Sequence, residues 1–180
     1  MHLCKWFQTV FRIKKMKMKK ISGHLKICVY LLFAVLLVFG CKKIENTSNS
    51  PVQEALLIRQ WVNTMKKNNF VVDSLSSGVY YIIESIGTGA FVQAGNNITI
   101  GYTGQFLDGS TFDASSSYTY VHKGAYSRMI PGWEDAVEKL SKGGKGIFLI
   151  PSSQAYGSNG YMVVPPYTPL LFEIEILDIQ

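Results

Sequence analysis

The chain has 180 residues, of which 47% are hydrophobic, and a formal net charge of +6 at pH 7. This length leaves room for one ordinary domain with short accessory segments. The positive charge is confined to residues 1–40, which hold eight Lys or Arg and no acidic residue, whereas residues 41–180 hold ten against twelve acidic ones, a net of 10 − 12 = −2. Because the basic residues form a leader and not a patch on a folded domain, we expect no nucleic-acid partner.

The side chains that follow the leader limit the chemistry. No cysteine follows Cys41, and His122 is the single histidine after residue 40, which excludes a disulfide, a thiol nucleophile and a Cys- or His-based metal site. The glycines at 87–89 and 157–160 lack the spacing of phosphate-binding loops, and no Ser-His-acid arrangement suggests itself. We therefore expect no metal and no cofactor, and a hydrolase or transferase fits poorly.

Residues 1–40 have the layout of a signal peptide. A basic stretch, KKMKMKKISGHLK, precedes the uncharged apolar run Ile27–Phe39, whose 13 residues are fewer than the roughly 20 of a membrane-spanning helix. Met16 or Met18 would give a more ordinary start. The run ends at a sequence that resembles a bacterial lipobox, which predicts Cys41 as the lipidated first residue of the mature protein. A signal anchor that is never cleaved is the alternative.

A tether and one helix are expected next. Residues 41–51 form the lipidated N-terminus and a polar tether rich in Asn and Ser, and residues 52–77 form an accessory helix with a linker. The helix, over 52–67, carries an apolar stripe at Leu57, Trp61, Val62 and Met65. An isolated helix of this length is marginally stable, so the stripe should pack on its own domain or, alternatively, form a dimer contact or a client-binding arm.

From residue 78 onward the pattern changes to strands around one helix. Alternation of apolar and polar residues predicts strands in NITIGYTGQF and LLFEIEILDI, and GIFLIP is a candidate for a buried strand. Between them, PGWEDAVEKLSKGG predicts a helix that ends at Gly143. Its apolar stripe consists of Trp133, Ala136, Val137 and Leu140. This order predicts an α+β domain at 78–180, with an antiparallel sheet wrapped over the helix.

Aromatic and aliphatic residues are unusually dense outside the regular core positions of this domain. They are Tyr102, Phe112, Tyr118, Tyr120, Ile130, Trp133, Tyr156, Val163 and Val164. Each one alone could be a core residue, but together they predict an apolar pocket with a few polar tips. Trp133, at the start of the helix, would form its floor.

Four stretches carry a resemblance to a known family. GYTGQFLDGSTFDAS, MIPGWEDAVEKLSKGGKGIFLIP, AYGSNG and VVPPYTPLLFEIEIL resemble the successive motifs of the FKBP-type peptidyl-prolyl cis–trans isomerases, in the family's order, within residues 78–180. Among these, lipoproteins associated with gliding motility are the subgroup that the chain resembles most. The resemblance implies an antiparallel half-barrel sheet curled around one short helix, with a ligand pocket between the sheet and the helix.

The resemblance also assigns site residues. It implies catalytic roles for Tyr102, Phe112, Asp113, Trp133, Tyr156 and Phe172, and substrate contacts for Tyr118, Met129, Ile130, Val163 and Val164. In the family, the hydroxyl at Tyr156 and the backbone N–H at Val164 bind substrate carbonyls, and the carboxylate at Asp113 interacts with the backbone or a polar neighbour. The chain departs from the family at Met129, where valine is usual, and at Tyr118, where Tyr120 could instead fill a phenylalanine position.

The implied activity agrees with the residue types. Rotation of an X–Pro amide has a barrier of about 18–20 kcal/mol in water but needs no covalent step, so a nucleophile is unnecessary. We expect clients that are proline-containing, unfolded or partly folded envelope proteins, a membrane link through the lipid anchor, and macrolide-type molecules as further pocket ligands. A non-catalytic binding or chaperone module, or an accessory subunit of an envelope machine for gliding or secretion, are the alternatives.

Overall fold

The computed structural model describes residues 49–124 and 128–180, all within one compact unit, Asn46–Gln180. The predicted signal peptide, the lipidation site at Cys41 and most of the tether lie outside the described residues. Among the described residues, no helix combines the length and the apolar character needed to cross a membrane.

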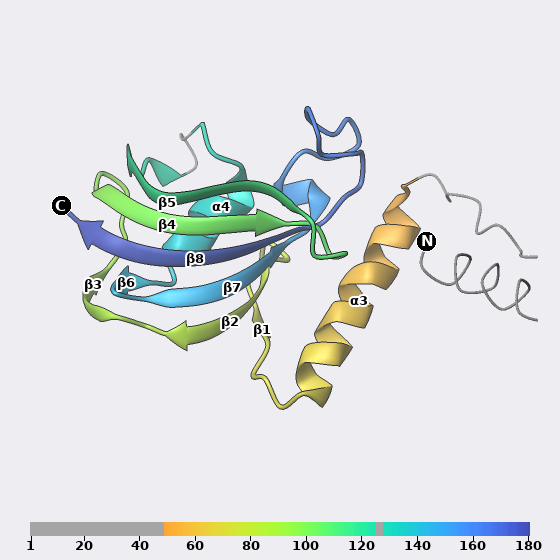
Figure 1. Cartoon of the computed structure of the whole chain (residues 1–180), viewed down its shortest axis with the longest axis horizontal. Helices are drawn as coiled ribbons and strands as arrows, with labels where there is room; N and C mark the ends of the chain where they lie inside the picture. Colours follow the sequence, from red (N-terminus) through yellow and green to blue (C-terminus); the bar gives the residue numbers. More distant parts are fainter. Residues whose placement is uncertain (1–48, 125–127) are drawn as a thin grey trace, which may run out of the picture. The chain divides into compact units, whose positions relative to one another are not determined.

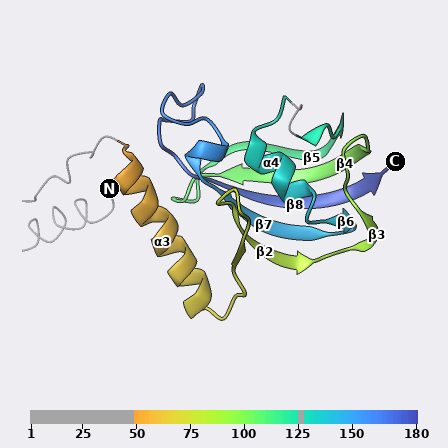
Figure 2. The ribbon, with the colours of Figure 1, turned by 180° about the vertical axis from the view of Figure 1, so that it is seen from behind.

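The domain is built on an antiparallel sheet with the strand order β1-β2-β7-β8-β4-β5. Its strands are β1 (Asp73–Ser74), β2 (Tyr80–Ser85), β4 (Asn97–Gln105), β5 (Thr111–Val121), β7 (Lys145–Ile150) and β8 (Leu170–Ile179). A second, two-stranded sheet pairs β3 (Thr88–Phe91) with β6 (Ser141–Lys142). The large sheet curls around a short helix, α4 (Pro131–Val137), as Figures 1 and 2 show from opposite sides. The predicted α+β class and the half-barrel sheet are confirmed.

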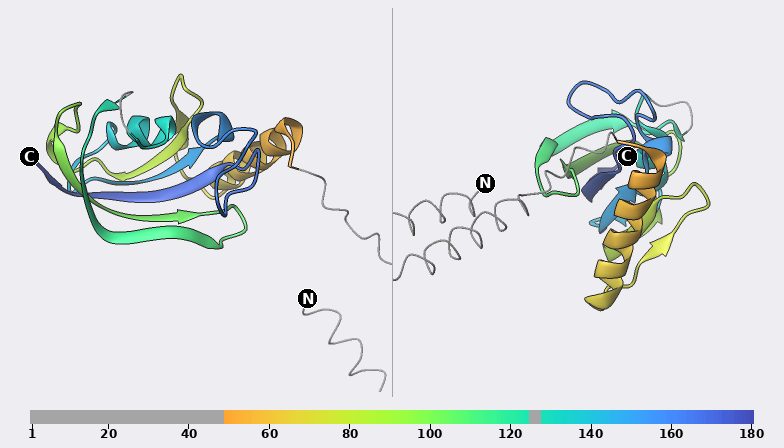
Figure 3. Two further views of the ribbon diagram at one scale, coloured as in Figure 1. Left: turned by 90° about the horizontal axis from the view of Figure 1, so that it is seen from above. Right: turned by 90° about the vertical axis from the view of Figure 1, so that its right-hand side faces the viewer.

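Alternation along the strands decides which side chains enter the core. In β8, Ile174 and Ile176 are fully buried whereas Glu173 and Glu175 face solvent, as their period of two predicts. Ile176 lies opposite Ile100 of β4, which is also fully buried. The inner face of the sheet is therefore a continuous apolar surface, and α4 packs on it (Figure 3, left).

The helix on this surface is shorter than the sequence predicts. α4 ends at Val137 instead of continuing to Gly143, because the N–H groups of Lys139 and Leu140 bond to carbonyls three residues earlier and tighten the last turn. The chain then enters β6, where the Ser141 hydroxyl donates to the Ile86 carbonyl at 2.8 Å. Leu140 is still fully buried, so the predicted apolar stripe faces the core although its last residue lies outside the helix.

The accessory helix α3 (Pro51–Lys67) occupies the predicted range to within one residue. Ser50 caps its start, because the side-chain hydroxyl accepts a hydrogen bond from the Gln53 N–H at 3.2 Å, and Pro51 occupies the first turn. Its apolar stripe is half-buried, which agrees with packing on the chain's own domain. Figure 1 shows α3 beside the end of the sheet at which β8 begins.

One buried carboxylate ties α3 to the domain. Glu54 accepts hydrogen bonds from the Ser152 backbone N–H at 2.5 Å and from the Ser152 hydroxyl at 2.6 Å. Burying a carboxylate is costly unless donors satisfy it, and these two do so. Ser152 begins the short 3-10 helix η2 (Ser152–Gln154), which leads directly into the loop that carries Tyr156. The position of α3 is thus linked to one wall of the predicted pocket.

Candidate active site

Three rings from three elements form the floor of the candidate site. Trp133 is 1% exposed in α4, and its indole meets the rings of Tyr102 on β4 and Phe172 on β8 at centroid distances of 5.0 and 5.1 Å. Both pairs are edge-to-face, the arrangement that aromatic rings prefer. The predicted floor under the concave face of the sheet is therefore present in the fold.

Phe112, on β5, forms a wall next to this floor. Its ring lies edge-on to Phe172 with a centroid distance of 5.5 Å, and on its other side it packs against Phe106 at 5.0 Å. Phe106 is the last residue of the predicted strand NITIGYTGQF and was not among the predicted site residues. Its place at the end of a strictly alternating segment is the feature that could have pointed to this contact.

Tyr102 has its hydroxyl fixed by an acidic neighbour. It donates to Asp113 Oδ2 at 2.9 Å, which is the kind of polar contact expected for that carboxylate. Burial, followed by this hydrogen bond, raises the pKa of Tyr102 to about 12. The phenol is therefore neutral at physiological pH and holds the Asp113 side chain at the edge of the aromatic floor.

Tyr118 and Tyr120, the two candidates for one family position, both lie near the floor but make different contacts with it. Tyr120 is half-buried and its hydroxyl accepts a hydrogen bond from Trp133 Nε1 at 2.9 Å. Burial and then the charge of Glu134 raise the pKa of Tyr120. Tyr118 is 40% exposed, stacks on Tyr120 at 5.6 Å and meets Tyr102 edge-on at 6.5 Å. Tyr120 orients the indole directly, whereas Tyr118 lies at the rim.

The loop after η2 closes the other side of the site. Tyr156 is half-buried against the core and stacks on Tyr161 at 5.2 Å, and burial is the main cause that raises its pKa. The turn needs Gly160, which has φ +68° and whose hydrogen, if replaced by a methyl group, would put that group against the Val164 carbonyl. Tyr156 is therefore supplied by a loop whose shape depends on a glycine.

The structure differs from expectation at the backbone of Val164. Its N–H donates to the Tyr161 carbonyl at 2.8 Å, and the Tyr161 N–H donates back to the Val164 carbonyl at 2.8 Å. This bridge closes the loop and occupies the N–H that was expected to bind a substrate carbonyl. The Val164 side chain is 5% exposed and packs in the core cluster next to the aromatic floor, while the neighbouring Val163 is exposed.

A buried histidine contacts acidic residues in and just after α4. His122, fully buried at the end of β5, contacts the Glu134 carboxylate through Nδ1 and the Glu138 carboxylate through Nε2, the latter at 2.9 Å. Glu134 follows Trp133 in α4, so this cluster fixes the helix that carries the indole. Sequence reasoning could not pair these residues, because the histidine lies 12 and 16 positions from the two acids.

The predicted site residues thus converge from separate elements. Met129 and Ile130 precede α4 and are half-buried against the same core, whereas Tyr118 and Val163 lie at the exposed rim. The arrangement provides apolar aromatic walls, a closed floor and the Tyr156 hydroxyl as a polar group. Such a surface can desolvate an apolar ring and its adjoining amide, and its chemistry requires no covalent intermediate.

Comparison with known sequences places these residues in a family. Residues 89–177 match the family described as FKBP-type peptidyl-prolyl cis-trans isomerase. The chain is 36% identical over 109 residues to FkpA of Aeromonas hydrophila, covering 61% of this chain and 41% of that protein. It is 33% identical over 136 residues to FkpA of Buchnera aphidicola subsp. Baizongia pistaciae, covering 76% and 52%. The chain therefore spans about half the length of the curated relatives it matches.

Solved structures of similar fold come from proteins of the same kind. The crystal structure of FkpA from Escherichia coli matches with a TM-score of 0.64 and 26% sequence identity, covering 99% of this chain and 81% of that one. A peptidyl-prolyl cis-trans isomerase from Pseudomonas syringae matches with a TM-score of 0.62 and 28% identity, covering 75% and 99%. The similarity extends to the half-barrel and its helix.

Proposed function

Because this chain belongs to the FKBP-type peptidyl-prolyl cis–trans isomerase family, we propose that it catalyses the cis–trans isomerisation of X–Pro bonds in polypeptides. The observation that carries the proposal is the aromatic floor of Trp133, Tyr102 and Phe172, with the Tyr156 hydroxyl at its edge. An apolar aromatic floor of this kind suits a proline ring, and the hydroxyl suits a peptide carbonyl.

Desolvation is the proposed source of the rate enhancement. Rotation about the amide removes its resonance, and the planar amide is more dipolar than the twisted one, so water stabilises the ground state more than the transition state. Aromatic walls remove that solvation, while Trp133 supports the ring and Phe112 with Phe172 limits its movement. Each tenfold gain in rate requires only about 1.4 kcal/mol, so a few such contacts suffice.

The proposed substrates and location follow from the leader. The basic and apolar segments before residue 40, and the lipobox-like sequence at Cys41, support export and lipid anchoring of a periplasm-facing protein in the bacterial envelope. The clients would be proline-containing envelope proteins that are unfolded or partly folded. The same apolar walls would accept macrolide-type ligands.

A non-catalytic binding module is the second candidate. The loop that closes the site exposes three large apolar side chains, Tyr161, Met162 and Val163, at 58%, 86% and 66%. Exposed apolar groups next to a binding site are typical of surfaces that hold unfolded chains. This loop would serve either an enzyme or a holding chaperone, so the two functions have to be separated by a rate measurement.

The test is the isomerisation rate of a short X–Pro peptide in the presence of the full chain, reconstituted in lipid nanodiscs. We expect acceleration by the wild-type protein and a loss of about tenfold or more in both Tyr156→Phe and Trp133→Ala variants, with folding verified by circular dichroism. Each tenfold loss corresponds to about 1.4 kcal/mol of transition-state stabilisation. A well-folded wild-type protein that gives no acceleration would exclude the catalytic function and favour the binding module.

A further inference from the structure

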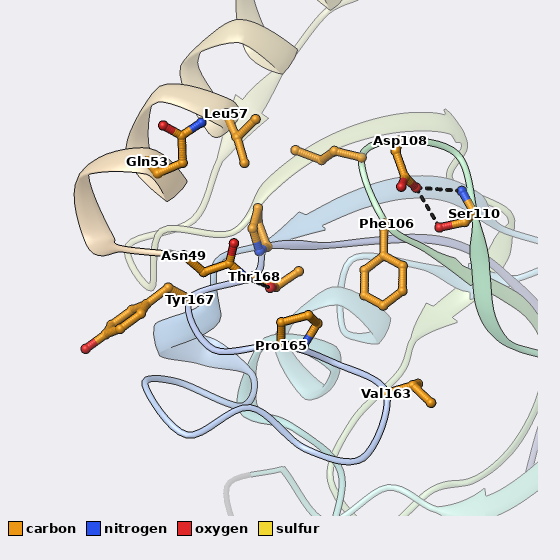
Figure 4. Close-up of a pocket in the computed structure, with 12 residues that line it drawn as sticks. Asn49, Gln53, Leu57, Phe106, Asp108, Ser110, Val163, Pro165, Tyr167 and Thr168 are labelled. Carbon is orange, nitrogen blue, oxygen red and sulfur yellow. Dashed lines mark hydrogen bonds between the residues drawn. The ribbon is translucent and has the colours of Figure 1, made fainter. Parts of the chain in front are cut away.

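A hollow lies between α3 and the loop that closes the candidate site. Its volume is about 540 Å³, and we call it the α3 groove. Gln53 and Leu57 line it from α3, and Phe106, Val163 and Pro165 line it from the domain. Figure 4 shows Gln53 and Leu57 on the helix, across the hollow from Phe106 and Pro165. Neither the family motifs nor the predicted site residues assign any role to α3 here.

The walls of the α3 groove are held in place before any ligand arrives. The hydrogen bonds from Ser152 to Glu54 fix the helix, and the side chain of Asn49, which lines the groove, donates to Thr168 Oγ1 at 3.3 Å. On the opposite wall, the Asp108 carboxylate accepts from the Ser110 N–H at 2.9 Å and its hydroxyl at 2.6 Å. A preformed site loses less conformational entropy on binding than one that has to be ordered.

The groove adjoins the proposed proline pocket at two places. Phe106 lines the groove on one side and packs on Phe112, the wall of the pocket, at 5.0 Å on the other. Val163, a groove residue, adjoins Val164, which packs next to the aromatic floor. The residues that flank a proline held over Trp133 would therefore lie beside the groove.

The lining suits an unfolded polypeptide more than a small polar ligand. Leu57, Phe106 and Val163 offer apolar surface, and the Gln53 amide can both donate to and accept from a peptide backbone. An extended chain presents an apolar side chain and an unpaired backbone amide side by side, which matches this combination. A folded protein pairs most of its backbone amides within its own structure, so an unfolded chain offers this combination more often than a folded surface does.

We infer that the α3 groove binds the stretch of an unfolded client chain next to its proline, and that Leu57 selects clients with an apolar side chain there. This inference rests on the proposed function, since it places the proline of the same client over Trp133. The accessory helix is then part of the substrate site. Its consequence is measurable, because clients that reach α3 should be preferred over those that fill only the proline pocket.

The experiment compares three peptides with the full chain in lipid nanodiscs. One is a blocked tetrapeptide with a single Leu-Pro bond, the second extends it at both ends with serines, and the third carries leucines within the same extensions. We expect kcat/KM for the leucine-extended peptide to exceed that of the serine-extended one about tenfold, equivalent to about 1.4 kcal/mol. Leu57→Ser should abolish this preference and leave the tetrapeptide rate unchanged.

The neighbouring residue provides a matched control. Leu56 lies on the same helix, is 42% exposed and does not line the groove, so Leu56→Ser should keep the preference for leucine. Equal effects of the two substitutions, or no preference in the wild-type protein, would overturn the inference. If no peptide is isomerised at all, the proposed catalysis fails, and the affinities of the three fluorescently labelled peptides, measured by anisotropy, decide the groove separately.

Two other occupants would give different results. If a second copy of the chain covers the groove, Leu57→Ser will reduce the molecular mass measured by light scattering and leave peptide affinity unaltered. If the chain's own tether covers it, the full chain will show no preference for the leucine-extended peptide, and the preference will appear only after residues 42–48 are deleted. Either result would overturn client binding as the role of the groove.

Discussion

The floor and the rim of the site are built in opposite ways. Trp133 is buried, receives edge-on contacts from two strands and donates a hydrogen bond to Tyr120, while His122 holds its helix from below. The rim is a loop of exposed apolar residues, shaped by a glycine and one backbone bridge between Tyr161 and Val164. The comparison indicates that core packing and buried polar contacts hold the floor, whereas the tip of the rim, Tyr161 to Val163, is exposed and depends on backbone geometry.

The largest expected effect comes from breaking the support of the floor. His122→Ala removes the partner of the buried Glu134 carboxylate and should lower the free energy of unfolding by about 3–5 kcal/mol, as is usual when one member of a buried pair is removed. Urea denaturation measures it. Glu138→Gln is the control, because Glu138 is half-exposed and should cost about 1 kcal/mol or less. Equal losses of unfolding free energy in the two variants would contradict a stabilising buried contact between His122 and Glu134.

The rim should be more sensitive to backbone geometry than to side-chain packing. Gly160→Ala forces a left-handed residue against the Val164 carbonyl and should cost about 1–3 kcal/mol, with a loss of peptide isomerisation as Tyr156 moves. Gly157→Ala is the matched control, since Gly157 also has positive φ but has open space around it, and should cost only about 1–2 kcal/mol. Thermal unfolding and the peptide isomerisation rate would be measured for both variants. If Gly160→Ala is no less stable than Gly157→Ala, a methyl group at residue 160 does not clash with the Val164 carbonyl.

Alkaline pH should lower the free energy of unfolding through Tyr102 of the floor, and we expect this effect to be smaller than those of the substitutions above. The pKa of Tyr102 is raised from 10.0 to about 12, so its neutral form is favoured in the folded state. The associated stability is complete below pH 10 and is lost as the pH rises through about 12, because the unfolded chain ionises first. The slope of the unfolding free energy in this interval should flatten in Tyr102→Phe. An unchanged slope would mean that other tyrosines dominate, among them Tyr120, whose pKa burial also raises.

The smallest stability effect is expected at the tip of the rim. Met162 is 86% exposed, so Met162→Ser should change the free energy of unfolding by less than about 0.5 kcal/mol. If the loop holds unfolded clients, the same variant should suppress the aggregation of a denatured protein less well than the wild type does. Light scattering of the denatured client measures this, and unaltered suppression would leave the exposed loop without a role in holding chains.

Much of the fold followed from local periodicity. The alternation around Ile174 and Ile176 predicted β8 and its buried face, and the spacing of Trp133, Ala136 and Val137 predicted the helix beneath it. The end of α4 was predicted too late, because the β6 pairing that captures Ser141 depends on Ile86, which lies far away in the sequence. Periodicity within a segment contains no information on such a partner.

The candidate site likewise contains a part that local sequence motifs predict and a part that they do not. The aromatic residues could be predicted because they recur in ordered motifs, and the contacts of Trp133 with Tyr102 and Phe172 agree with them. The bond between Glu54 and Ser152 joins residues 98 positions apart, and no motif contains either of them. A lone Glu on an amphipathic helix is normally a solvated residue, so its burial could be found only in the folded chain.

The bond between Glu54 and Ser152 also has a mechanical meaning. If the chain is held at its N-terminus, a pull on the tether first meets the hydrogen bond between Asn49 and Thr168. It then reaches the domain through the buried carboxylate of Glu54 before the linker after Lys67 is stretched. The load then falls on Ser152, four residues before Tyr156, and not on a strand of the sheet. A protein anchored in this way would transmit tension on its tether to the loop that closes the candidate site.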